Sequence, residues 1–189
     1  MQTQTFILGP GQSKSYLIES SLGNFIIDLG GEDFDELLNY IQKTNLEING
    51  IIITHGHYDH ILGLNKFVSL NNCKVFISSG DKDFLYDPSL NLSKFWGDGE
   101  FILDKGIEVH VLENGSKIGP FDVKFTPGHT RGSICLFDHE NKNIFTGDTL
   151  FPNGEGRTDL PTGDDFLIVK SIFELSKYLK KGYKIFAGH

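Results

Sequence analysis

Short apolar runs alternate with amphipathic stretches along this chain, a pattern that predicts a mixture of strands and helices. Strands are expected first at residues 5–8, 15–19 and 24–28. Asp33 and Glu36 then have the spacing of a capping box, so a helix is expected to begin at this point. Its apolar face would consist of Phe34, Leu37, Leu38 and Ile41.

The middle of the chain repeats the order of strand and helix. The β-branched run Ile51–Ile53 predicts a buried strand over residues 50–54, followed by a helix and by another strand at 74–77. Residues 81–100 have no regular pattern but contain several aromatic side chains. Such a segment is either a satellite packing cluster or one wall of a substrate cleft. The apolar face of the intervening helix would be formed by Ile61, Leu64, Phe67 and Val68.

The second half of the chain again predicts strands followed by a helix. Thr162 is expected to cap a long helix that ends at residues 180–182, and a last strand follows at 183–186. Two runs of strands with helices predict an α/β sandwich, in which two sheets face each other and the helices lie outside. The four strands before this helix are expected at 108–112, 121–126, 133–137 and 143–145. The apolar face of the helix would be formed by Phe166, Val169, Ile172, Phe173, Leu175 and Leu179.

Composition and charge narrow the class of protein. The 189 residues include 39% hydrophobic residues and 16 phenylalanines, which predicts one domain over residues 1–189 with a sizeable core. The formal charge of -8 disfavours a nucleic-acid surface and binding to anionic membranes. No apolar run reaches the length of a membrane span, and residues 1–5 lack a secretory signal pattern. Because Cys73 and Cys135 are the two cysteines, a reduced cytoplasmic protein is expected.

A cluster of polar residues follows the predicted strand at 50–54. His55, His57, Asp59 and His60 lie within seven residues, in the sequence THGHYDH at 54–60. The end of a buried strand holds side chains more precisely than a free loop does. Histidine is the commonest metal ligand, and a neighbouring carboxylate favours zinc, iron or manganese. The cluster therefore predicts a metal site.

Three other predicted strands end in the same way. His129 follows a strand and a Pro-Gly turn, Asp148 follows the strand at 143–145, and His189 follows the last strand. With the first cluster, these residues make five histidines and two aspartates at strand ends. Seven candidate ligands exceed the three that one catalytic zinc needs, but they suit two divalent ions that share a carboxylate. Two such ions about 3.5–4 Å apart can hold a water and lower its pKa toward neutrality.

These motifs occur in the order found in the metallo-β-lactamase superfamily, which the sequence resembles over nearly its whole length. They are THGHYDH at 54–60, PGHT at 127–130, GDTLF at 147–151 and GH at 188–189. The resemblance implies a four-layer αββα sandwich of two mixed sheets flanked by helices. It also implies that two divalent ions are bound, with zinc as the first candidate and iron or manganese as the others. By this resemblance one metal takes His55, His57 and His129, the second takes Asp59, His60 and His189, and Asp148 bridges both.

Within that superfamily, the chain looks most similar to the small hydrolases related to type II glyoxalases. The segments that carry this resemblance are 87–88, 91–93 and 156–159. It implies that a metal-held hydroxide hydrolyses a small thioester or related ester, with Asp59 also accepting a proton. Full type II glyoxalases carry a further C-terminal helical region with basic residues for glutathione. This chain has no room for such a region after His189, so the resemblance does not extend to glutathione as the thiol carrier.

Three other kinds of function stay open from the sequence. A persulfide dioxygenase of the same superfamily would use one iron, with His55, His129 and Asp148 as the implied ligands. Lactonase and β-lactamase activities are weaker options, because no residue of the chain points to a ring substrate. A metal-binding module without turnover would fit the fold, but it would more often close its metal site completely.

Some polar residues are candidates for supporting roles. Arg157 is expected to pair with Asp159 or to support a metal ligand, rather than to contact substrate directly. Tyr58 could donate a proton to substrate or simply pack, and the sequence does not decide between these roles. His110 and His139 lie in an alternating strand and in a turn, so neither is expected to bind metal. The expected partner is a small-molecule substrate, and the sequence does not predict an oligomeric state.

Overall fold

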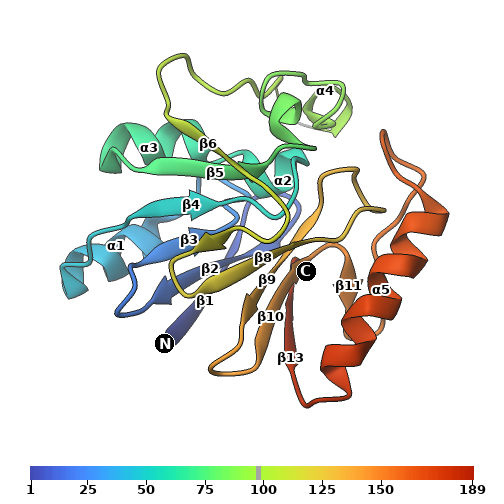
Figure 1. Ribbon diagram of the computed structural model, residues 1–189. Coiled ribbons are helices and arrows are strands. Elements are labelled where there is room, and N and C mark those ends of the chain that lie inside the picture. Colours follow the sequence, from blue (N-terminus) through green and yellow to red (C-terminus); the bar gives the residue numbers. More distant parts are fainter. Residues whose placement is uncertain (97–98) are drawn as a thin grey trace.

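The computed structural model describes residues 1–96 and 99–189, and its strands form two facing sheets with helices on the outside (Figure 1). The first sheet has six strands in the order β1-β2-β3-β4-β5-β6. Its first three strands pair antiparallel and the rest pair parallel, so the sheet is mixed. The strands are β1 (Gln2–Leu8), β2 (Ser13–Glu19), β3 (Phe25–Ile27), β4 (Gly50–Ile52), β5 (Lys74–Ser78) and β6 (Val109–Leu112).

The second sheet has five strands in the order β13-β10-β9-β8-β7. Strand β13 pairs parallel with β10, whereas the other pairs are antiparallel, so this sheet is mixed as well. A separate two-stranded ribbon follows β10 and consists of β11 (Leu150–Phe151) and β12 (Gly154–Glu155). The strands of the second sheet are β7 (Lys117–Ile118), β8 (Phe121–Phe125), β9 (Ile134–Asp138), β10 (Asn143–Gly147) and β13 (Lys184–Ala187).

A buried apolar cluster joins the two sheets. It combines residues from β2, β3 and β4 of the first sheet with residues from β8, β9 and β10 of the second. Phe145 lies at its centre, with its ring centroid 5.2 Å from that of Tyr16, 5.5 Å from that of Phe121 and 4.8 Å from that of Phe186. This cluster fills the space between the two sheets of the sandwich.

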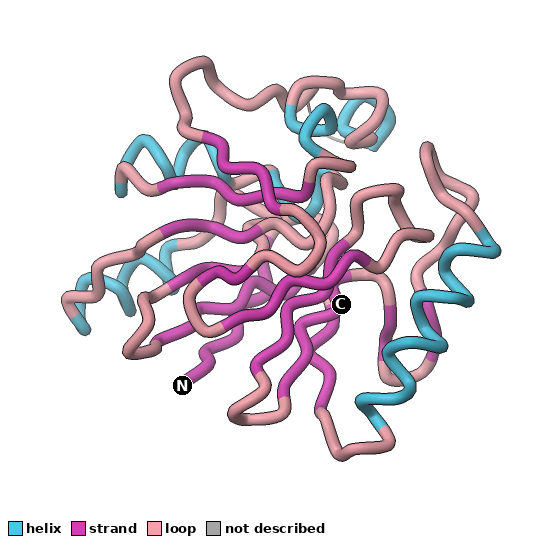
Figure 2. The backbone as a smooth tube through the Cα atoms, viewed as in Figure 1, coloured by secondary structure: helices cyan, strands magenta, loops and turns pink. Residues whose placement is uncertain are grey.

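Helices cover the outer face of each sheet (Figure 2). Helices α1 (Asp35–Thr44) and α3 (Leu64–Asn71) pack on the first sheet, and α5 (Asp165–Leu179) packs on the second. The predicted four-layer αββα sandwich of two mixed sheets is therefore confirmed. The short helices are α2 (Tyr58–Ile61), α4 (Ser93–Trp96) and a 3-10 turn at Lys82–Leu85. None of the described helices has the length and apolar character needed to cross a bilayer.

The capping box predicted for the first helix is wrong. Helix α1 begins after Phe34, and no side chain caps its N-terminus. Asp33 instead accepts a hydrogen bond from the backbone N–H of Gly9, with 2.8 Å between the two atoms. The carboxylate thus fixes the loop between β1 and β2, a contact 24 residues away that local spacing could not reveal.

The cap predicted for the last helix is also wrong. Asp164 caps α5, because its carboxylate accepts a hydrogen bond from the backbone N–H of Leu167. Thr162 instead accepts a hydrogen bond through its hydroxyl from the backbone N–H of Arg131. The loop that precedes α5 is thereby attached to the loop that follows β8.

The apolar face predicted for this helix is wrong in four of its six positions. Phe166, Val169, Phe173 and Leu179 are exposed, at 77%, 65%, 63% and 36% of their full accessibility. Helix α5 instead turns Ile168 and Leu175 toward the second sheet. The close approach of the Pro-Gly turn sets this orientation, because a Cβ at Gly128 would lie only 2.3 Å from the backbone nitrogen of Ile168.

The aromatic segment at 81–100 is packed into the fold at its start, as expected of a packing cluster, and is exposed toward its end. Phe84 and Leu85 are fully buried, whereas Phe95 and Trp96 at its far end are exposed. Positions 97–98 of the predicted segment lie outside the described residues.

We expect Phe145→Ala to lower the free energy of unfolding by about 3–5 kcal/mol, since it removes the ring at the centre of the buried cluster between the two sheets. Denaturation in urea, followed by circular dichroism, measures this loss. Phe166→Ala makes the same chemical change on the exposed side of α5 and should alter stability by no more than about 0.5 kcal/mol. Equal effects of the two variants would contradict this account of the core.

Candidate metal centre

The structure brings all seven predicted ligands together at one edge of the sandwich. They come from loops and from a short helix that follow β4, β8, β10 and β13. The ligand atoms form three overlapping groups, within each of which they lie no more than 4.8 Å apart. The groups are His55, His57 and His129; His55, His60 and Asp148; and Asp59, His60 and His189.

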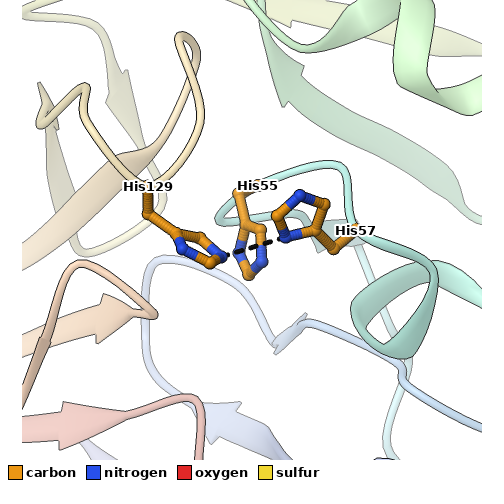
Figure 3. A group of neighbouring side chains, drawn as sticks. All are labelled: His55, His57 and His129. Atoms are coloured by element: carbon orange, nitrogen blue, oxygen red, sulfur yellow. Dashed lines mark hydrogen bonds between the residues drawn. The ribbon is translucent and has the colours of Figure 1, made fainter. Parts of the chain in front are cut away.

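The first group consists of three buried imidazoles that face one another (Figure 3). The Nδ1 atom of His57 lies 2.9 Å from the Nε2 atom of His129. The ring centroid of His55 is 4.9 Å from that of His57 and 4.7 Å from that of His129. Three nitrogen donors with such spacing match the protein ligand set of a single divalent ion.

The second group lies beside the first and is less buried. The Nε2 atom of His189 is 3.5 Å from a carboxylate oxygen of Asp59. The ring of His60 is fully buried, and its centroid is 5.4 Å from that of His189. Because His189 is the most exposed of the three, this side of the centre opens toward solvent.

Asp148 lies between the two groups. Its Oδ1 atom is 3.4 Å from Nε2 of His60, and its Oδ2 atom is 3.8 Å from Nε2 of His129 and 3.6 Å from Nε2 of His189. Glycine at position 188 allows the backbone to come this close, because a Cβ there would lie 2.1 Å from Asp148 Oδ1. One carboxylate therefore reaches the nitrogens of both groups.

Hydrogen bonds to Nδ1 orient three of the histidines so that Nε2 faces the centre. His60 donates to a carboxylate oxygen of Asp28 at 2.9 Å, and His129 donates to the backbone carbonyl of Arg157 at 2.7 Å. His55 Nδ1 lies 3.1 Å from the hydroxyl of Thr54, which itself donates to Asp28. Such outer bonds fix the ring and its tautomer in metal sites.

Asp28 was not recognised as part of the site from the sequence. Besides His60, it accepts hydrogen bonds from the backbone N–H and the hydroxyl of Thr54, each at 2.7 Å. Its place directly after β3, before the glycine pair at 30–31, repeats the strand-end pattern of the ligands. That pattern is the signal that could have identified it.

Asp81 was also missed, and it connects two ligand-bearing loops. Its buried carboxylate accepts hydrogen bonds from the backbone N–H of Gly56 at 2.9 Å, the hydroxyl of Thr130 at 2.6 Å and the backbone N–H of Gly132 at 2.8 Å. Burial raises the pKa of Asp81 to about 6, against the opposing effect of these hydrogen bonds. Gly56 separates His55 from His57, and Thr130 follows His129.

The protonation of the histidines differs between the two groups. Burial, reinforced by the neighbouring histidines, lowers the pKa of His55 and of His57, so both are neutral at pH 7 and can bind metal. Burial also lowers the pKa of His129. For His60, burial acts in the same direction, but Asp148 and Asp28 outweigh it and raise the pKa to about 10. Without metal, a proton therefore occupies part of the second group.

Several buried polar atoms at the centre lack a hydrogen-bond partner among the described residues. They are Nε2 of His55, of His57 and of His60, and Oδ1 of Asp148. A buried polar group without a partner costs about 1–3 kcal/mol, so four at one place need an explanation. Divalent ions would satisfy those atoms that face the centre, because nitrogen lone pairs and carboxylate oxygens are their usual ligands. The residues present thus fit a pair of divalent metals.

Sequence comparison decides the family. The sequence model of the family described as "Metallo-beta-lactamase superfamily" matches residues 8–189. The chain belongs to this superfamily. It is 33% identical over 199 aligned residues to the probable metallo-hydrolase YqgX of Bacillus subtilis, covering 100% of the chain and 90% of that relative. It is 30% identical to the hydroxyacylglutathione hydrolase GloC of Haemophilus influenzae, covering 94% of the chain and 85% of that relative.

Two solved structures of similar proteins agree with this assignment. The crystal structure of the B3 metallo-beta-lactamase BLEG-1 has a TM-score of 0.89 and 29% sequence identity, covering 100% of the chain and 91% of that protein. The crystal structure of TTHA1623 in a di-iron-bound form has a TM-score of 0.87 and 31% identity, covering 98% and 91%. The fold and the metallo-hydrolase character of this superfamily therefore apply to the chain.

The remaining polar candidates lie outside the metal groups of this metallo-beta-lactamase fold. Arg157 pairs through two guanidinium nitrogens with Asp159, at 2.6 and 2.7 Å, while its carbonyl supports His129 as described above. His110 lies 2.6 Å from a carboxylate oxygen of Glu108, and His139 lies 2.7 Å from the hydroxyl of Tyr183.

We expect removal of metal by a chelator to lower the thermal midpoint, and divalent zinc to restore it. At a thousandfold excess over the dissociation constant, bound metal adds about 4 kcal/mol to the free energy of unfolding. The pKa of His60 in the fold, about 10, lies above the value near 6.5 expected in the unfolded chain. Protonation of His60 therefore stabilises the metal-free fold, fully so below pH 6.5. This stabilisation is lost as the pH rises through 10. Metal must displace that proton.

The rise in midpoint on adding zinc should therefore grow from pH 7 to pH 9, which differential scanning fluorimetry can follow. His110→Ala, a surface histidine variant, should show the same pH dependence as the wild type. A rise that is independent of pH would contradict the proton displacement at His60.

Proposed function

We propose that this chain is a dinuclear metal-dependent hydrolase that cleaves a small thioester or a related ester. The observation that carries the proposal is the position of Asp148, whose carboxylate lies within 4 Å of histidine nitrogens from both ligand groups. A centre for one ion would not need a carboxylate shared between two such groups. Zinc is the first candidate for both ions.

Two divalent ions held by these groups would supply a hydroxide at neutral pH and would polarise the carbonyl under attack. The chain's own residues hold and orient this centre. Nε2 of His55, His60 and His129 points inward because Nδ1 of each ring is hydrogen-bonded outside the centre. Asp59 is ionised, because the bond with His189 and the other histidines outweigh the effect of burial and lower its pKa. As an ionised carboxylate it can bind metal, and we propose that it also accepts a proton as the carbonyl is attacked.

The relatives support hydrolysis but differ in the activities that their names state. GloC is named a hydroxyacylglutathione hydrolase, an enzyme of thioesters, whereas YqgX is named only as a probable metallo-hydrolase. BLEG-1 is described as a β-lactamase, and TTHA1623 as binding two irons. Thioester cleavage fits the first of these relatives, and iron is the alternative to zinc.

Metal quantification combined with a substrate screen tests this proposal. Protein purified without added metal is analysed for zinc, iron and manganese, and is then assayed on thioesters, lactones, β-lactams and phosphoesters while oxygen consumption is recorded. Two metals per chain and thioester cleavage without oxygen uptake support the proposal. One iron per chain with oxygen uptake would indicate a dioxygenase that uses His55, His129 and Asp148. Metal-loaded protein that turns over none of these substrates would indicate a non-catalytic module.

A further inference from the structure

A cavity of about 310 Å³ opens directly onto the metal centre. Its floor contains metal-site residues from both groups, among them His57, Asp59 and Asp148. This volume is at the lower end of the range for small-molecule sites, about 300–1,000 Å³. When the carbonyl of a substrate lies at the floor, the small group attached to that carbonyl therefore lies against the walls. The walls contain Tyr58, Leu92, Trp96, Phe151 and Leu160.

These walls are mostly apolar and reach close to the metal ligands. The ring centroid of Phe151 lies 6.4 Å from that of His189. Trp96, which also lines the cavity, keeps 52% of its surface exposed. An apolar group bound here would remove part of this indole from water, which is favourable in proportion to the area covered.

The backbone at Leu92 is held in an unfavourable conformation at this wall. Its φ of 74° lies in the left-handed region, which is costly for a residue with a branched side chain. Asn91 fixes the turn, since its side-chain amide donates to the carbonyls of Phe84 and Phe101, at 2.8 and 3.1 Å. Its own carbonyl accepts from the backbone N–H of Tyr58 at 2.8 Å. Strain maintained by such contacts is typical of segments that shape a ligand site.

The described lining residues of this cavity offer no unpaired lysine or arginine. Arg157 is the one cationic side chain among its described lining residues, and its guanidinium is engaged by both carboxylate oxygens of Asp159. The same guanidinium lies 5.9 Å from the ring centroid of Trp96. A carboxylate on the substrate would therefore have to compete with Asp159 for the arginine.

A second cavity, of about 500 Å³, also lacks a cationic side chain among its described lining residues. Tyr58 lines both cavities, and the described lining of the second includes Glu32 and Glu100 but no lysine or arginine. Its apolar lining is formed by Leu62, Phe101 and Ile102 together with Pro10. The described lining residues of the two cavities therefore supply no unpaired lysine or arginine for a carboxylate on the acyl group.

We infer that this site takes thioesters whose acyl group is apolar and carries no carboxylate, the acyl group packing against the cavity walls that contain Trp96 and Phe151. This inference rests on the proposed function and narrows it. The two ions attract the reacting carbonyl at the floor, whereas the walls select what is attached to it. Charge on the acyl group is disfavoured as long as Asp159 occupies Arg157.

The test compares three N-acetylcysteamine thioesters that share one leaving thiol and differ only in the acyl group. The metal-loaded full chain should cleave the phenylacetyl thioester with a kcat/KM about tenfold above that of the acetyl thioester, and the succinyl thioester should be the poorest. Trp96→Ala should remove most of the phenylacetyl advantage, mainly through KM. Phe95→Ala is the matched control, because this neighbouring exposed ring does not line the cavity and its loss should leave the order unchanged.

Asp159→Asn supplies an independent test, because it frees Arg157 and should raise cleavage of the succinyl thioester relative to the acetyl one by about fivefold. Equal rates on the three thioesters, a preference for the succinyl compound, or an unchanged preference in Trp96→Ala would overturn the inference while leaving the proposed function intact. Loaded protein that cleaves none of the three contradicts the proposed function, and this inference with it.

Discussion

Replacing Asp148 by alanine is expected to reduce kcat/KM for thioester hydrolysis by about a thousandfold or more. Its carboxylate is the group that lies within reach of histidines from both ligand sets. Metal polarisation of a carbonyl stabilises the transition state by several kcal/mol, and each 1.4 kcal/mol corresponds to a factor of ten in rate. Loss of the shared ligand should remove at least one metal and most of this stabilisation.

Metal content per chain and kcat/KM, measured on the same sample, check this expectation. Asp122→Ala is a matched control, because this aspartate lies on β8 in the same sheet and makes only surface ion pairs. It should retain both metals and activity within about twofold. Circular dichroism distinguishes a lost metal site from a lost fold. A folded Asp148→Ala protein with two metals and full activity would contradict the shared role of this carboxylate.

The ligand positions could be predicted because each depends on a local pattern. A short apolar run followed at once by histidine or aspartate indicates a buried strand that ends in a polar group, as at Asp148 and His189. Since several strands of a sandwich end at one edge, such residues meet without any further information from the sequence. The alternation of strands and helices predicted the four layers for the same reason.

The residues that hold the ligands in place could not be predicted in this way. Asp28 accepts a hydrogen bond from Thr54, which is 26 residues away along the chain. Asp81 accepts one from Gly56, which is 25 residues away. An aspartate at the end of a strand looks the same whether it binds metal, supports a ligand or faces solvent. Only the packing of loops that are distant in sequence distinguishes these cases.

The orientation of α5 shows a different limit. Its sequence has apolar residues on two sides, with Phe166, Val169 and Phe173 on one and Ile168 and Leu175 on the other. Periodicity therefore predicts a helix without deciding which side faces the sheet. The contact with the Pro-Gly turn decides it, and that contact is tertiary.

Replacing Asp81 by alanine is expected to lower the free energy of unfolding by about 3 kcal/mol and to weaken metal binding at the first ligand group. Three donors, on Gly56, Thr130 and Gly132, would lose their acceptor in a buried place. Each unpaired donor costs about 1–3 kcal/mol, although the costs do not add fully once the loops relax. The loops that carry His57 and His129 would then no longer be attached to each other.

Urea denaturation at pH 8, where the Asp81 carboxylate is ionised, measures the stability, and zinc titration measures the affinity. Asp83→Ala is the matched control: it removes an exposed carboxylate two residues away that pairs with Arg131, so its effect should stay below about 1 kcal/mol with unchanged zinc affinity. Asp81→Asn keeps one acceptor oxygen and should recover part of the affinity. A purely structural role predicts lower stability in Asp81→Ala with zinc affinity at the wild-type value, and that result would show that Asp81 does not position the ligands.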